Sequence, residues 1–245
     1  MAQPSTLRHP PIVEALVDLR ASVPGAPKMF MALADELKDE FPTTEERQEL
    51  RSTIEVKEGK LVPPRVDPPA FGGVQIANVD QTIYVQFRPD GFTLNNLKSY
   101  MGGGQLIEKA LGHWELLVER AKPEIVSRVA LRYINRLELP FERGDKFTRY
   151  LTAAPELPEG APQQVSRFLT RVVGHDERRQ ATAVVSQQLR QQKGKPVVTV
   201  DIDVYRTEDF PVDSVALREV LDSLRVLKNE TFFSLLTDET VNFYK

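Results

Sequence analysis

The stretch SRVALRYINRLELP, residues 127–140, decides the fold of this chain. Apolar residues alternate along it with basic ones, and a period of two is typical of a β-strand that buries one face. We therefore predict a strand over residues 124–139. Its apolar side is expected to face a core, and its other side to carry three guanidinium groups, those of Arg128, Arg132 and Arg136.

Similar patterns continue on both sides of this strand. Apolar or alternating runs predict strands at residues 12–21, 50–57, 74–79, 82–88, 165–173, 182–191 and 196–206. Helical spacing predicts helices at residues 28–41, 105–122 and 146–152, and a long one that begins at Asp213 or Ser214. The apolar stripe of that last helix comprises Val215, Leu217, Val220, Leu221, Leu224 and Leu227. The proline-rich residues 61–73 are predicted to be a loop, and RPDG, residues 88–91, a turn.

These elements repeat in order on either side of Pro123, as strand, helix, three strands and helix, although the residues of the two halves do not match. Consecutive strands joined by short turns pair antiparallel. We therefore predict an α+β fold in which two pseudo-repeats, residues 1–123 and 124–245, pack as one structural unit. They are expected to form a broad antiparallel sheet with helices on one face. This layout is similar to the TATA-binding-protein-like and helix-grip folds.

The sheet face without helices is the candidate binding surface. Strand alternation adds to its three arginines a second set of polar residues, namely Arg167, Arg171, Asp201, Asp203 and Tyr205. One interpretation is cross-strand pairing of opposite charges, which keeps an open sheet soluble. The other is a concave surface that binds an anionic or peptide partner, because guanidinium groups suit phosphate and carboxylate.

Composition sets further bounds on the class of protein. The 245 residues carry a net charge of -3, whereas a protein that holds nucleic acid nonspecifically usually has a strong positive balance. There is no cysteine, which excludes disulfides, thiolate metal ligands and a cysteine nucleophile. The N-terminal residues do not form a signal peptide, and no apolar run approaches the roughly 20 residues that span a bilayer. We expect a cytoplasmic protein without membrane contact.

The sequence contains no recognisable catalytic constellation. His9, His113 and His175 are widely separated and show no metal-binding spacing. Asp201 and Asp203 are able to bind a divalent cation from one strand face, but no third acid or histidine accompanies them, so pairing with arginines is favoured. The run GGG at residues 102–104 lacks the other residues of a phosphate-binding loop. We assign no catalytic residue, no metal site and no cofactor.

Three stretches together resemble a sporadically distributed family of uncharacterised bacterial proteins of about this length. They are HPPIVEALVDLR, LRYINRLELP and LRVLKNETFFSLLTDE. The resemblance supplies no catalytic residue, but it draws attention to Pro11, Glu14, Arg132, Asn135, Arg136, Asn229, Phe233 and Thr237. From these we add Asn135 and Asn229 to the candidate binding residues. The patchy distribution of such a family implies an antitoxin-like or phage-defence accessory role.

Taken together, these features favour a non-enzymatic binding protein that uses the helix-free sheet face to hold a protein partner. Two alternatives stay open, a nucleic-acid or nucleotide binder that uses the arginines, and a metal-dependent hydrolase built on Asp201 and Asp203. The sequence does not decide between a monomer and a homo-oligomer.

Overall fold

The computed structural model describes residues 2, 4–50, 52–53, 56–57, 60–61, 65–141, 145–192 and 195–245, with the backbone alone described between residues 52 and 66. The main-sheet strands are β1 (Ile12–Arg20), β2 (Thr43–Glu49), β7 (Ala70–Ala77), β8 (Ile83–Arg88), β9 (Gly91–Leu97), β10 (Arg128–Glu138), β11 (Phe168–Asp176), β12 (Ala181–Gln192) and β13 (Lys195–Arg206). The helices are α1 (Pro27–Glu36), α2 (Gly103–Ala121), α3 (Ser214–Ser234) and α4 (Asp238–Asn242), with a 3-10 turn η1 (Phe147–Arg149).

The nine main strands form one antiparallel sheet in the order β11, β12, β13, β10, β1, β9, β8, β7, β2. The central pair is β1 and β10, whose neighbours on the outer sides are β9 and β13. The predicted α+β class and the broad antiparallel sheet are therefore confirmed.

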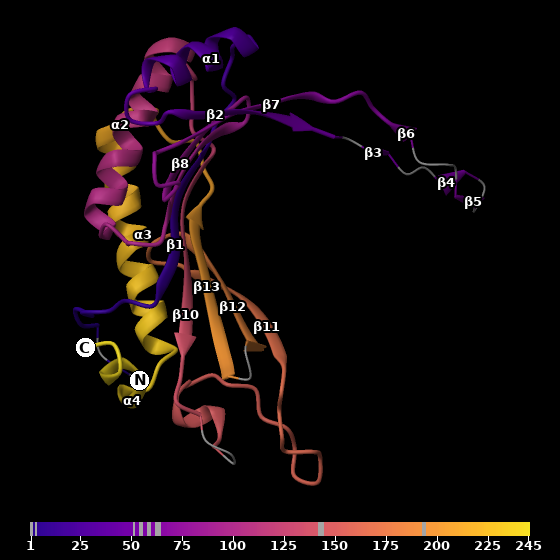
Figure 1. Cartoon of the computed structure of the whole chain (residues 1–245), viewed down its shortest axis with the longest axis vertical. Coiled ribbons are helices and arrows are strands. Elements are labelled where there is room, and N and C mark those ends of the chain that lie inside the picture. The colour runs from indigo at the N-terminus through magenta and orange to yellow at the C-terminus, as the bar shows by residue number, and fades with distance from the viewer. Residues whose placement is uncertain are drawn as a thin grey trace.

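The alternation along β10 places its apolar residues under the helices. Val129, Leu131 and Tyr133 are fully buried, whereas Arg128 and Arg132 are only half-buried. Figure 1 shows α1, α2 and α3 along one side of the sheet, with no helix on the other. Burying each large apolar side chain contributes roughly 1.5–3 kcal/mol, so this one-sided core holds the helices in place.

The two long helices begin in different ways. Asp213 precedes α3 as predicted, and its Oδ1 accepts a hydrogen bond from the backbone N–H of Ala216 at 2.9 Å. The N-terminus of α2 follows Gly102 and has no side-chain cap. The predicted apolar stripe of α3 was wrong at its start, because Val215 is 71% exposed and lies off the buried face.

Replacing Asp213 with Ala is expected to lower the free energy of unfolding by about 1 kcal/mol, because the first turn of α3 loses its side-chain acceptor. Urea denaturation of the two proteins measures this difference. Asp213→Ser is the matched control, since a serine side chain caps a helix as well, and it should restore most of the lost stability. Equal stability of Asp213→Ala and the parent would show that the cap contributes nothing.

Beyond the sheet, the chain between β2 and β7 forms a hairpin arm. Its backbone pieces are β3 (Ser52–Thr53), β4 (Val56–Lys57), β5 (Lys60–Leu61) and β6 (Arg65–Val66), with β3 paired to β6 and β4 to β5. Figure 1 shows this arm projecting away from the side of the sheet that carries no helix. The predicted loop at residues 61–73 is therefore partly strand, although residues 62–64 lie outside the described part of the chain.

Several predicted elements need correction. The edge strand β2 lies at residues 43–49, before the predicted strand at 50–57, which falls partly outside the described residues. Strand β9 was not predicted, nor was α4. The predicted helix at 146–152 is only the turn η1, and the strand predicted to begin at residue 165 begins at Phe168.

Within the part of the chain that the structure describes, no helix combines the length and the apolar composition that a bilayer crossing requires.

Candidate functional site

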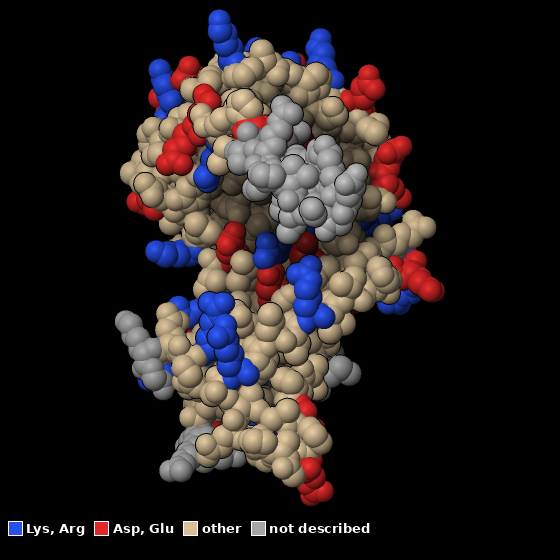
Figure 2. All heavy atoms as spheres, turned by 90° about the vertical axis from the view of Figure 1, so that its right-hand side faces the viewer, with Lys and Arg blue, Asp and Glu red and all other residues tan. Residues whose placement is uncertain are grey.

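The side of the sheet opposite α1, α2 and α3, which we call the open face, carries most of the candidate residues. Pairing of β10 with β13 puts Arg132 directly opposite Asp203 and Arg136 opposite Thr199. Side chains that oppose each other in an antiparallel pair project from the same face. Figure 2 shows acidic and basic side chains intermixed in a band across the middle of this face.

Asp18 on β1 is the centre of an ion-pair cluster on the open face. It is 7% exposed. Its Oδ1 accepts hydrogen bonds from Arg128 Nη1 at 3.0 Å and Arg20 Nε at 3.1 Å. Its Oδ2 accepts from Arg88 Nη2 at 3.0 Å and Thr93 Oγ1 at 2.9 Å. These five residues, the Asp18 cluster, join four adjacent strands, β8, β9, β1 and β10.

The environment of Asp18 favours its charged form. Burial acts to raise its pKa, but the charges and hydrogen bonds of its neighbours, Arg20 and Arg88 foremost, outweigh burial and hold the pKa below its ordinary value. Asp203 on β13 shows the opposite balance, because burial raises its pKa and the charge of Arg128 offsets this only in part. Asp18 is therefore the better stabilised of the two carboxylates.

Two of the predicted arginines are fully engaged with carboxylates. Arg132 holds Asp201 in a two-point contact, Nε to Oδ1 at 2.9 Å and Nη2 to Oδ2 at 2.6 Å. Arg128 donates from Nη2 to Asp203 Oδ2 at 3.0 Å, and its guanidinium carbon lies 4.4 Å from the centre of the Tyr205 ring. Cross-strand pairing, the first interpretation, therefore accounts for these five candidate residues.

The same contacts bear on the metal alternative. The carboxylates of Asp201 and Asp203 are each engaged in an ion pair with an arginine, Asp201 with Arg132 and Asp203 with Arg128. Among the described residues, no group of three or more His, Asp or Glu side chains is arranged to hold a metal ion.

A second group of arginines lies toward one end of the open face, over β10, β11 and β12. We call Arg136, Arg171 and Arg190 the basic end. Arg136 pairs with the exposed Glu138 at 2.9 Å, and its Nε is buried without a partner. Arg171 lies opposite Ser186, which in turn lies opposite Asp201, so Arg171 projects from the open face. Figure 2 shows several basic side chains below the mixed band.

Two members of this region lack a carboxylate partner. No ion pair joins Arg171 or Arg190 to any residue that the structure describes, and both side chains are exposed. The predicted residue Arg167 is also exposed, but it lies one position before β11 rather than within a strand. The apolar residues Leu169 and Val173, which are 68% and 52% exposed, lie beside Arg171 on the same face.

The two candidate asparagines do not belong to the open face. Asn135 is 1% exposed on the helix side of β10, and its Nδ2 donates to the carbonyl of Val200 at 3.2 Å. Asn229 lies on α3. Both line a cavity on the helix side. The two asparagines therefore lie apart from the other candidate binding residues, on the opposite side of the sheet.

Sequence reasoning also missed Lys228 on α3, which is 7% exposed and lines the same cavity. A signal for it was present, because Lys228 follows Leu224 by four positions and Leu221 by seven. Residues at this spacing share one helix face, so the predicted stripe already placed a lysine among buried leucines.

No family model matches this chain, and no curated protein matches it. The resemblance to a sporadic bacterial family therefore stays a prediction.

Proposed function

We propose that this chain is a non-enzymatic binding protein that takes an extended, acidic segment of a partner protein as an added strand along β11. The observation that carries the proposal is the composition of that strand. β11 is the last strand of the sheet, and three of its apolar side chains, Leu169, Val172 and Val173, are 52–68% exposed next to unpaired Arg171.

An exposed edge strand offers a row of unpaired backbone N–H and C=O groups. Partner segments use such edges to extend a sheet, with main-chain hydrogen bonds for affinity and side chains for specificity. β11 has nine residues, which is long for an unprotected edge. Its exposed valines and leucine sit on both of its faces, so a partner strand would cover apolar surface whichever way its side chains point.

The positive charge beside β11 determines which kind of partner segment fits there. Arg171 and Arg190 present two guanidinium groups with no described carboxylate to neutralise them, and glutamate or aspartate side chains fit them in two-point contacts. Pairing of two copies of β11 would instead bring their arginines together. Like charges on adjacent strands are destabilising, so an acidic partner is favoured over self-association.

The nucleic-acid alternative receives less support. The arginines of the Asp18 cluster and Arg132 are already neutralised by aspartates, and Arg136 is paired with Glu138. At the basic end this leaves Arg171 and Arg190 without an ion-pair partner among the described residues. The chain has a net charge of -3. A duplex bound through about two phosphate contacts would show a salt dependence with a slope near -2, which makes the two alternatives separable by experiment.

The finer description of the fold is also a proposal. We infer that the two halves are pseudo-repeats, in the manner of the TATA-binding-protein-like or helix-grip folds. In support, β1 pairs with β9 and β10 pairs with β13, so the first strand of each half lies beside the last. One long helix follows that last strand in each half. The predicted role as an antitoxin-like or phage-defence accessory protein fits a partner-binding chain.

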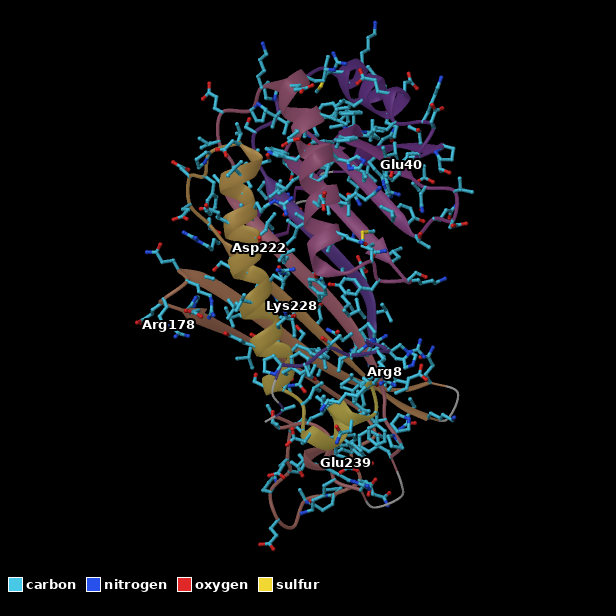
Figure 3. All side chains as sticks on the ribbon, turned by 90° about the vertical axis from the view of Figure 1, so that its left-hand side faces the viewer. Arg8, Glu40, Arg178, Asp222, Lys228 and Glu239 are labelled. Carbon is cyan, nitrogen blue, oxygen red and sulfur yellow. The ribbon has the colours of Figure 1, made fainter. Side chains whose placement is uncertain are left out.

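The test measures binding of a fluorescent peptide of alternating Glu and Val residues, as long as β11, by fluorescence anisotropy. We expect saturable binding to the full chain, and binding weaker by about tenfold or more after the double change Arg171→Glu and Arg190→Glu. Arg178→Glu is the matched control. Figure 3 shows Arg178 at the turn that joins β11 to β12, away from the basic end. Arg178→Glu therefore changes the net charge by the same amount as each of the two test substitutions, but at a different place.

Three outcomes would contradict this proposal. The first is equal peptide binding by the double variant and the parent. The second is tighter binding of a short DNA duplex than of the peptide, with the steep salt dependence of phosphate contacts. The third is a dimer, detected by analytical ultracentrifugation, that forms equally in the parent and the double variant and does not dissociate when the peptide is added.

A further inference from the structure

A cavity of about 530 Å³ lies on the helix side of the sheet, apart from the open face. Its walls come from the N-terminal segment with Leu7, from Tyr100 and Gly103 before and at the start of α2, and from Lys228 and Phe232 on α3. This volume falls within the range of pockets that hold small organic molecules. No acidic side chain is among the described residues that line it.

Lys228 is the most unusual group in this cavity. Its side chain is 7% exposed, yet no hydrogen bond or ion pair joins it to any residue that the structure describes. Its Nζ lies 3.8 Å from the centre of the Tyr133 ring. The ring face offers weak attraction to a cation but not a counter-charge. A buried ammonium group is costly unless it is paired, so an anion placed beside Nζ would offset the cost of burying it.

The N-terminus of α2 adds further hydrogen-bond donors. Helix N-termini expose backbone N–H groups and carry a positive partial charge. A side chain at Gly103 would collide there, since a Cβ atom would lie 2.9 Å from Arg225 Cδ and 3.1 Å from the hydroxyl of Tyr100. Glycine therefore lets both groups approach the first turn of the helix.

The hydroxyl of Tyr100, which lines the cavity, adds to this wall, and the hydroxyl of Tyr133 lies behind it. The hydroxyls of Tyr100 and Tyr133 lie 3.2 Å apart. Burial raises the pKa of both groups, so each keeps its proton at neutral pH. One of the two hydroxyls donates to the other, and Tyr100 is free to donate to a ligand when Tyr133 is the donor of that bond. Ser5 also lines the cavity, and its Oγ is buried with no hydrogen-bond partner.

We propose that this cavity binds an organic carboxylate that carries an apolar body. The charge of Lys228 has no partner, whereas Arg225 is paired with Asp222 at 3.2 Å. Lys228 and the partial charge of the α2 N-terminus together match one negative charge rather than two. Phe232 and Phe233, which also line the cavity, supply apolar surface for the rest of the ligand.

This site does not depend on the proposed partner-binding role, because it lies on the other side of the sheet. Figure 3, which views the helix side, shows Lys228 midway along α3, between Asp222 farther up the helix and Arg8 of the N-terminal segment.

Isothermal titration of the full chain at pH 7 tests the proposal with three probes. They are 4-phenylbutyrate, its uncharged amide 4-phenylbutyramide, and inorganic phosphate. We expect 4-phenylbutyrate to bind one site with a Kd below about 1 mM, and the amide to bind about tenfold more weakly or less. Absence of binding by 4-phenylbutyrate overturns the proposal. Equal affinity of the amide also overturns it, and so does binding of phosphate alone.

Two variants connect the binding to the cavity. Lys228→Met keeps the length of the side chain without its charge, and it is expected to weaken 4-phenylbutyrate binding by about tenfold or more. Arg218→Met is the matched control, because Arg218 is an exposed cation on the same helix and outside the cavity. Binding that Lys228→Met leaves unchanged, or that Arg218→Met weakens equally, assigns the carboxylate to another place and overturns the proposal.

Discussion

Replacing Asp18 with Asn is expected to lower the free energy of unfolding by about 3 kcal/mol at pH 7. The change removes the carboxylate that binds Arg20, Arg88 and Arg128 together, and leaves those side chains in place with their more exposed partners Asp90 and Asp203. Removing one partner of a buried ion pair typically costs roughly 3–5 kcal/mol. These arginines keep 17–43% of their side-chain exposure, so they recover part of that loss in water, and the lower end of the range applies.

The matched control for this prediction is Asp203→Asn. Asp203 lies on the same face and also binds Arg128, but among the described residues Arg128 alone is bonded to its carboxylate, whereas three guanidinium groups are bonded to Asp18. Its raised pKa indicates that its charge is poorly compensated. We therefore expect a loss of only about 1 kcal/mol. Urea denaturation of both variants measures the contrast, and equal losses would show that the Asp18 cluster is no more than a set of surface pairs.

The pH dependence of the Asp18 variant follows from the same cluster. The folded pKa of Asp18 lies below its value in the unfolded chain, so its contribution to stability is present above about pH 4 and is lost as the pH falls through the folded pKa. The difference between the parent and Asp18→Asn should therefore shrink below pH 4. A constant difference down to pH 2 would assign the loss to packing rather than to charge.

The elements that the sequence predicted well are those whose pattern reports burial on one side. β10 and β13 alternate along most of their length, so both their existence and the direction of their arginines and aspartates followed from a period of two. β2 has the sequence TTEERQE and is exposed along nearly its whole length. A strand at the edge of a sheet buries little, and it leaves no apolar period to detect.

The candidate site was harder to predict for geometric reasons. Alternation shows which face an arginine lies on, but the strand register and the side-chain reach decide its partner. Arg132 lies directly opposite Asp203 and yet binds Asp201, two residues along β13. The cavity could not be predicted from the sequence, because its walls come from four segments that are far apart along the chain. Asn135 and Asn229, which lie 94 positions apart in the sequence, became neighbours only through the packing of α3 on β10.

Lys228→Met is expected to make the protein more stable, by about 2 kcal/mol at pH 7. Burial lowers the pKa of Lys228 to about 8, whereas a lysine in the unfolded chain has a pKa of about 10.4. Below pH 8 the ammonium group is charged in both states, and the folded state bears the full cost of burying it. Methionine fills the same space without charge and so removes that cost, less the modest attraction to the Tyr133 ring.

The size of this stabilisation depends on pH in a way that identifies its cause. Between pH 8 and about 10.4 the folded protein has released the proton of Lys228 and the unfolded chain has kept it, so the stability of the parent rises with pH. The advantage of Lys228→Met should therefore fall from about 2 kcal/mol at pH 7 to nearly zero at pH 9.5. Thermal or urea unfolding of both proteins at these two pH values measures it, with Arg218→Met as the control for loss of a cation from α3.

An advantage that does not change with pH would mean that methionine gains stability through packing, and that Lys228 carries no buried charge at pH 7. The expected result has a consequence for the cavity. A chain that keeps a destabilising ammonium group where methionine would be more stable gives up stability at that position, and such a loss is typical of residues that bind ligands. Addition of 4-phenylbutyrate should then stabilise the parent protein and leave Lys228→Met nearly unchanged, because a ligand that pairs with the charge removes the cost of burying it.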